Sequence, residues 1–248
     1  MIDAALIEEY RVWCEKMRAH PHSRGGFETD GDLALLNAFA ARAPLSKSQL
    51  FQDLMVLHKT ANKRNGYFVE FGACDGLYFS NTYLLEKAFG WRGIVAEPAP
   101  IWRDGLFRNR SCFISTKCVF TESGQTLTFN QTTTDAALST IDAFTTCDSH
   151  AGIRAEGLRH EVETISLNDL LAQANAPHEI DYMSIDTEGS ELDILSRFDF
   201  SAHTINIISV EHNYTPAREQ IYNLLSTRGF RRDHVRLSFF DDWYFREA

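Results

Sequence analysis

Short apolar runs and longer amphipathic stretches follow one another along most of the chain. The apolar runs at 67–71, 93–96, 180–185 and 205–210 are typical of strands that are buried on both faces of a sheet. The amphipathic stretches between them place apolar residues three or four positions apart, which is the spacing of one helix face. This alternation predicts an α/β fold with a doubly wound, mostly parallel sheet.

The same pattern predicts the remaining elements. Helices are expected at 3–19, 33–43, 46–65, 80–89, 101–108, 167–174, 191–198 and 216–228. Further strands are expected at 112–120, 126–130 and 162–166, with 230–237 and 243–246 as a closing antiparallel pair. The polar segment 131–160 is interpreted as a lid or substrate loop, with a linker that has no role as the alternative.

These elements predict an N-terminal helical extension over residues 1–60 and a main domain over residues 61–248. In the first predicted helix, Leu6, Tyr10 and Trp13 share one face. That face can pack on the sheet, line a substrate pocket or form a homodimer, and the sequence leaves these options open.

The composition limits the classes of partner. The 248 residues carry a net charge of −10, which argues against nucleic acid or an anionic membrane as the main partner. The five cysteines form no C-x-x-C pair, as expected of reduced thiols. Acidic residues interrupt the first predicted helix and no apolar run is long enough to span a membrane, so a cytoplasmic protein is expected.

The turn after the run at 67–71 is the centre of the predicted site. Gly72 and Gly76 allow a sharp turn and a close approach to a ligand, and Ser80 or Asn81 can begin the next helix. A strand, a glycine turn and a helix N-terminus together form the kind of cradle that binds nucleotides.

The residues around this turn favour one cofactor over another. Cys74 stands where a dinucleotide motif has its second glycine. Glu70 and Asp75 would repel phosphates and attract a cation. S-adenosylmethionine, with its sulfonium and amine, therefore fits better than NAD. Glu97 ends the next strand, where an acidic residue binds ribose hydroxyls.

Ligands of open α/β sheets bind beyond the carboxyl ends of the strands. Those ends carry Glu70, Glu97, Cys118, Asp186, Glu188, Glu211, His212 and Asn213. Several carboxylates at one edge need a cation, which can be a sulfonium, an amine or a metal ion. The alternative is that individual carboxylates cap the helices that follow.

Transfer of a methyl group to a hydroxyl requires that a base or a metal ion removes the hydroxyl proton. His212 is the first candidate base, because it follows a strand and its side chain titrates near neutrality. A scaffold role for His212 is the alternative. Asp186, Glu211 and Asn213 offer hard oxygen ligands from adjacent strand ends, so they form a candidate Mg²⁺ site.

Several separate motifs occur in the order that is typical of one family. They are GYFVEFGACDG from Gly66, SNT from Ser80, EP from Glu97, IDYMSIDTEGSELDIL from Ile180 and VEHN from Val210. From about Ser46 to Tyr244, the chain resembles the FkbM family of S-adenosylmethionine-dependent methyltransferases. The resemblance implies a Rossmann-like class I sheet of seven strands, one of them antiparallel, and most often O-methylation of a sugar or natural-product hydroxyl.

The resemblance also implies roles for individual residues. Glu70, Gly72 and Gly76 would hold the methionine portion of the cofactor, with Ala73, Asp75, Ser80 and Asn81 in the same set. Glu97 would hold the ribose with Pro98 beside it, and Cys118 and Val119 would lie beside the adenine. Asp186, Glu188, Glu211 and His212 would face a small-molecule methyl acceptor. The alternatives are N-methylation of an amide or amine, a cofactor-binding module without turnover, and an NAD-dependent oxidoreductase.

Overall fold

The computed structural model describes residues 30–247, so the predicted helix at 3–19 lies outside the described residues. The helices are α2 (Asp30–Arg42), α3 (Gln52–Lys59), α4 (Tyr83–Phe89), α5 (Arg103–Asn109), α6 (Ala151–Arg154), α7 (Leu167–Gln173), α8 (Glu191–Arg197), α9 (Ala217–Ser226) and α10 (Val235–Ser238). Short 3₁₀ helices lie at Ala43–Leu45, Pro100–Trp102, Ala136–Leu138 and Asp142–Phe144. The strands are β1 (Tyr67–Phe71), β2 (Arg92–Ala96), β3 (Phe113–Ser115), β4 (Cys118–Phe120), β5 (Thr126–Gln131), β6 (Thr140–Ile141), β7 (Leu158–Ser166), β8 (Glu179–Ile185), β9 (Thr204–Glu211), β10 (Phe230–Asp233) and β11 (Asp241–Arg246).

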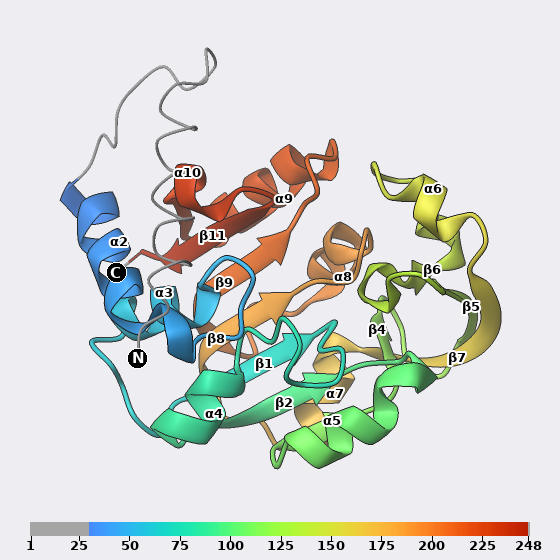
Figure 1. The fold of residues 1–248 in the computed structure, drawn as a ribbon, viewed down its shortest axis with the longest axis horizontal. Coiled ribbons are helices and arrows are strands. Elements are labelled where there is room, and N and C mark those ends of the chain that lie inside the picture. The colour runs from blue at the N-terminus through green and yellow to red at the C-terminus, as the bar shows by residue number, and fades with distance from the viewer. Residues whose placement is uncertain (1–29, 248) are drawn as a thin grey trace.

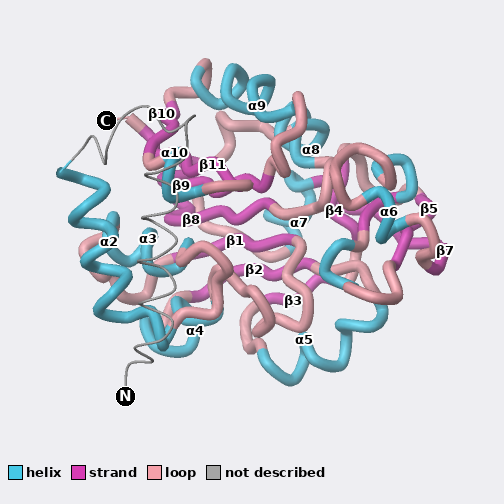
Figure 2. Tube along the Cα trace, turned by 45° about the horizontal axis from the view of Figure 1, so that its top comes forward, coloured by secondary structure: helices cyan, strands magenta, loops and turns pink. Residues whose placement is uncertain are grey.

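A seven-stranded sheet forms the centre of the molecule, in the order β10-β11-β9-β8-β1-β2-β3 (Figure 2). β1 pairs in parallel with both β2 and β8, and β8 pairs in parallel with β9. β11 runs antiparallel to both of its neighbours, β9 and β10. The predicted Rossmann-like sheet with one antiparallel strand is therefore confirmed.

Helices cover both faces of this sheet. Successive strand residues point to opposite sides, and apolar side chains on both sides must be buried. Phe68 belongs to the core shared with α2, α3 and α4, whereas Val69 belongs to the core shared with α7, α8 and α9. Tyr182 and Met183 of β8 divide in the same way. The doubly wound arrangement thus follows from strands that carry apolar side chains on both faces.

A second, four-stranded sheet lies beside the main one, in the order β4-β7-β5-β6 (Figure 1). The prediction of one strand at 112–120 was wrong, because this stretch contributes to both sheets. Ser115 pairs with Ala96 in the main sheet, whereas Cys118 pairs with Thr164 in the small one. The chain turns between them, where the Lys117 amide donates to the Ser115 hydroxyl at 3.3 Å.

The segment 131–160 is folded rather than a plain loop. It contains two 3₁₀ helices, β6, α6 and the beginning of β7. β5 and β7 pair antiparallel across it, from Thr126 opposite Glu163 to Gln131 opposite Leu158. The segment therefore extends the small sheet and continues into α6 (Figure 1).

Two other predicted elements are shorter than expected. The helix expected at 46–65 extends only over α3, because the preceding residues form a loop in which the Ser46 hydroxyl donates to Asp53 at 2.6 Å. The strand expected at 230–237 ends at Asp233, and α10 follows it. Within residues 30–247, no helix is both long and apolar enough to cross a lipid bilayer.

Candidate active site

Gly72 is required where β1 ends against the end of β8. Its φ is +82°, a left-handed conformation that favours glycine, and a Cβ built on it would lie 1.6 Å from the Asp186 carbonyl oxygen. The Asp186 amide donates to the Phe71 carbonyl at 3.2 Å. Gly72 therefore allows the ends of two central strands to lie together, and Asp186, the first residue after β8, lies directly beside the glycine turn.

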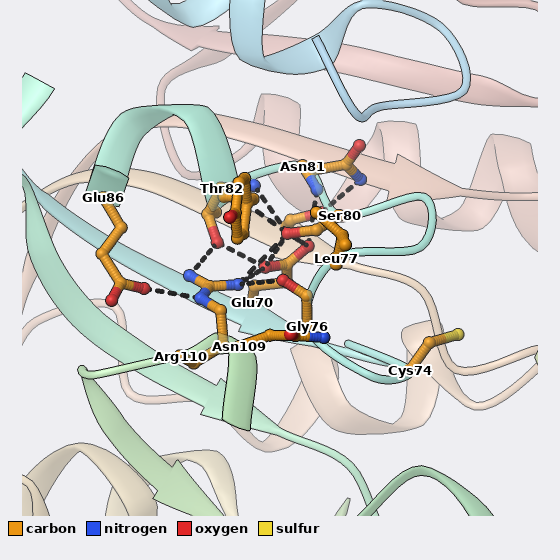
Figure 3. Close-up of polar contacts among 12 residues, drawn as sticks. Glu70, Cys74, Gly76, Leu77, Ser80, Asn81, Thr82, Glu86, Asn109 and Arg110 are labelled. Carbon is orange, nitrogen blue, oxygen red and sulfur yellow. Dashed lines mark hydrogen bonds and ion pairs between the residues drawn. The ribbon is translucent and has the colours of Figure 1, made fainter. Parts of the chain in front are cut away.

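Glu70 and Arg110 form a buried ion pair that holds this turn (Figure 3). Arg110 Nη1 donates to the Glu70 carboxylate at 3.1 Å, and its Nε donates to Glu86 at 2.5 Å. The Asn81 amide donates to Glu70 at 2.6 Å, and the hydroxyls of Ser80 and Thr82 also donate to it. The Glu70 carboxylate thus accepts several protein donors and fixes the 80–82 segment, and its predicted contact with the methionine portion of the cofactor stays a prediction.

One cavity of about 450 Å³ lies at the carboxyl ends of the central strands, between the main sheet and the small sheet. Most of the predicted site residues line it: Glu70, Gly72, Asn81, Glu97, Pro98, Cys118, Val119, Asp186, Glu188, Glu211 and Asn213. Five predicted residues, Ala73, Asp75, Gly76, Ser80 and His212, are not among its lining residues.

The turn residues that do not line the cavity have structural roles. Asp75 Oδ1 accepts the amides of Leu77 and Tyr78 at 2.9 and 2.7 Å, and the Ala73 amide donates to the Ala96 carbonyl. A Cβ on Gly76 would lie 2.4 Å from the Arg110 side chain. These residues shape the turn without facing the cavity.

One end of the cavity is apolar and contains a single buried acid. Cys118, Val119, Phe129 and Ile141 contribute its walls. Glu97 accepts the amides of Cys74 at 3.0 Å and of Ala99 at 2.8 Å. Burial, with a smaller contribution from Asp186, raises the pKa of Glu97 to about 7. A flat apolar group and a neighbouring pair of hydroxyls would fit this end.

The other end of the cavity is acidic. Asp186, Glu188 and Glu211 each bring a carboxylate oxygen within 4.8 Å of the other two. Burial raises the pKa of Asp186 to about 7, and burial together with the neighbouring carboxylates raises the pKa of Glu188 and Glu211 well above the usual range. Carboxylates this close repel each other when both are charged, so Asp186 and Glu211 share a proton or face a cation.

The predicted Mg²⁺ site is not supported by this geometry. Asn213 Nδ2 donates to Glu188 at 3.2 Å, so the Asn213 amide nitrogen faces the cluster. Glu188 is paired with Arg154, whose Nη2 lies 2.5 Å from its carboxylate. Arg154 therefore supplies a positive charge to the cluster at Glu188, where a metal ion would otherwise be expected.

The prediction of His212 as the catalytic base is also not supported. The Tyr214 amide donates to His212 Nδ1 at 3.0 Å, so the proton is on Nε2, which donates to the Asp241 carbonyl at 3.1 Å. Burial lowers the pKa of His212 to about 4. A neutral histidine with both ring nitrogens bonded holds β9 to β11 and has no free atom for an acceptor.

Sequence reasoning missed several residues that line the cavity. Tyr78 and Phe79 lie in the loop before α4, and both side chains are substantially exposed. Phe79 has a φ of +56°, which is strained for a bulky residue and typical of functional loops. His150 and Ile153 reach the cavity from the segment 131–160, where no periodic pattern marked them.

The family model for the methyltransferase FkbM domain matches residues 70–243. The chain belongs to the FkbM methyltransferase family. It is therefore an S-adenosylmethionine-dependent methyltransferase, and the NAD-dependent oxidoreductase alternative is set aside. No curated protein matches the chain.

Solved structures similar to this FkbM methyltransferase are distant. A precorrin-6y C5,15-methyltransferase from Geobacter metallireducens is 11% identical with a TM-score of 0.39, covering 73% of this chain and 71% of its own. A ribosomal protein L11 methylase from Lactobacillus delbrueckii subsp. bulgaricus is 9% identical with a TM-score of 0.41, covering 79% and 77%. A SAM dependent methyltransferase from Aquifex aeolicus is 10% identical with a TM-score of 0.33, covering 94% and 96%. The family assignment rests on the domain match.

The cavity of this FkbM methyltransferase fits S-adenosylmethionine. Asn81 Oδ1 is buried, and within residues 30–247 no donor contacts it, so a ligand donor such as the methionine ammonium would satisfy it. Its own Nδ2 donates to Ser184 at 2.9 Å, which fixes the side chain. Glu97 would accept ribose hydroxyls, and the apolar end would hold the adenine.

Proposed function

We propose that this protein transfers the methyl group of S-adenosylmethionine to a hydroxyl on a small-molecule acceptor, such as a sugar or a hydroxylated natural product. The proposal depends on one observation: Asp186 and Glu211 bring carboxylate oxygens within 4.8 Å of each other at the acidic end of the cavity. A pair that shares one proton keeps one negative charge, which can accept a second proton. The raised pKa of Asp186 suits a general base for a weakly acidic hydroxyl.

The cofactor supplies an electrophilic methyl group on a sulfonium. The acidic end of the cavity favours this positive charge, and Asn81 and Glu97 would fix the orientation of the cofactor. Asp186 would accept the proton of the acceptor hydroxyl as the new C–O bond forms and the S–C bond breaks. The products are a methyl ether, S-adenosylhomocysteine and a proton on the carboxyl pair. In-line positioning supplies much of the remaining acceleration.

The cavity walls favour a neutral acceptor. Within the described residues, no Lys or Arg lines the cavity, so a phosphorylated acceptor or nucleic acid has no cationic partner there. Tyr78 and Phe79 line the cavity and are 45% and 38% exposed, with ring centroids 3.8 Å apart. Such an aromatic surface suits the apolar face of a sugar ring or of a natural-product skeleton.

A panel of methyl acceptors tests the proposal. The purified protein is incubated with S-adenosylmethionine and sugars, polyols, hydroxylated natural products, amines or amides, and S-adenosylhomocysteine and methylated products are measured by mass spectrometry. O-methylated products that disappear in Asp186→Asn support the proposal. Products that form only with amines or amides would instead establish N-methylation, and nucleic-acid methylation would contradict the assignment of a small acceptor.

A further inference from the structure

The segment 132–157 forms one wall of the cavity. The turn at 135–139, Ile141, His150 and Ile153 all line the cavity from this segment. Only Ile141 among them belongs to an apolar core, which it shares with Phe129 and Val162. Polar interactions must therefore hold much of the wall in position.

Arg154 is the central residue of these interactions. Its side chain is fully buried, although arginine is almost never buried without partners. Nε donates to the Leu138 carbonyl at 2.8 Å, Nη1 to Asp148 at 2.8 Å and Nη2 to Glu188 at 2.5 Å. One guanidinium thus joins the cavity-lining turn, the loop before α6 and the acidic cluster.

The contacts of Glu188 show the other side of the same connection. Its backbone is in the left-handed region with φ +59°, and its carbonyl accepts the Thr140 hydroxyl at 2.9 Å. Its carboxylate faces Asp186 on its own loop, Glu211 at the end of β9, Asn213 after β9, Glu191 on α8, and Asp148 and Arg154 on the wall. Arg154 is the one cation among these groups, so the attractive charge interaction of Glu188 within this set is with the wall.

We propose that Arg154 is a positioning residue that fixes the 132–157 wall to the acidic cluster through Glu188, so that the wall closes the cofactor cavity. Loss of this ion pair lets the wall separate from the cluster and releases the cofactor faster. The inference rests on the proposed function for its ligand, S-adenosylmethionine, but its structural part concerns the free protein.

Two measurements on the full chain test it. Hydrogen exchange of residues 132–141 is followed without ligand, and S-adenosylhomocysteine binding is followed by calorimetry. In Arg154→Gln we expect exchange of this segment to become at least about tenfold faster, while exchange in β1 and β8 is unchanged. We expect binding to weaken by about tenfold or more, since truncating one partner of a buried charge pair mainly speeds dissociation.

Three further variants make the test specific. Arg108→Gln removes an exposed arginine on α5, outside the wall, and it should leave both measurements unchanged. Arg154→Lys keeps the charge without the forked geometry and should restore part of the loss. Glu188→Gln should also make exchange of residues 132–141 faster. The double variant Arg154→Gln with Glu188→Gln should exchange this segment no faster than Arg154→Gln alone.

Unchanged exchange of 132–141 in both Arg154→Gln and Glu188→Gln would overturn the proposal. Full additivity of the effects of the two substitutions on this exchange would also overturn it. If Arg154→Gln does not fold, the exchange measurement on Glu188→Gln decides the test, because glutamine has nearly the same shape as glutamate and this variant should fold. Wild-type protein that binds neither S-adenosylmethionine nor S-adenosylhomocysteine would refute the proposed function, whereas the exchange results would still test the positioning role.

Discussion

Replacing Arg110 with methionine should strongly destabilise the protein. Arg110 and Glu70 are each 3% exposed, and Arg110 also donates to Glu86, Ser80 and Thr82. Arg110→Met leaves the Glu70 carboxylate buried without its cation. Breaking such a pair from one side costs about 3–5 kcal/mol. For a chain of this size, that loss lowers the melting temperature by about 10 °C.

Urea unfolding followed by circular dichroism measures this loss. Arg108→Met is the matched control, because Arg108 is exposed in the last turn of α5, two residues before Arg110, and its loss should cost less than about 0.5 kcal/mol. Glu70→Gln combined with Arg110→Met should be less destabilising than the sum of the single changes, with a coupling of about 1–3 kcal/mol. A loss below about 1 kcal/mol in Arg110→Met, or additive effects, would refute the view that this pair holds the turn.

Three other outcomes follow from the geometry. Gly72→Ala should prevent stable folding, as seen in a melting curve, because its Cβ would lie 1.6 Å from the Asp186 carbonyl oxygen. His212→Asn should keep turnover per folded molecule within about threefold, whereas Asp186→Asn should lower it about 10²–10⁴-fold in the same assay. Without cofactor, stability should fall as pH rises from 4.5 to about 7, because Glu97, like Asp186, keeps its proton longer in the folded state than in the unfolded state. Urea unfolding at pH 5 and pH 7.5 measures this, and a flat profile, or one that Glu97→Gln does not make shallower, contradicts the role of Glu97.

The central sheet was predictable because its central strands carry runs of apolar residues on both faces. β1, β8 and β9 lie where the apolar runs indicated, and the carboxyl ends of these strands bring together most of the predicted acids. The division between β3 and β4 was not predictable, because both are short extended stretches and the sequence does not state which sheet each one joins.

The partners of buried charged residues were the other feature that the sequence could not predict. Arg110 pairs with Glu70 across 40 positions and Arg154 pairs with Glu188 across 34, and no local pattern marks either pair. Both arginines resemble ordinary surface residues in the sequence. His212 was misinterpreted for a related reason: its position after a strand was visible, but the backbone groups that occupy its ring come from Tyr214 and from β11.

Along the chain, β4 is the first strand of the small sheet and β7 is the last. The two pair side by side, with Cys118 opposite Thr164. The stretch between them therefore leaves and rejoins the body of the protein at nearly the same place. Such a stretch can be exchanged as a cassette between family members without rerouting the central sheet. Glu97 and Asp186 lie outside it, while Phe129, His150 and Ile153 lie within it. Replacement of this stretch would change one wall of the cavity and leave Glu97 and Asp186 in place.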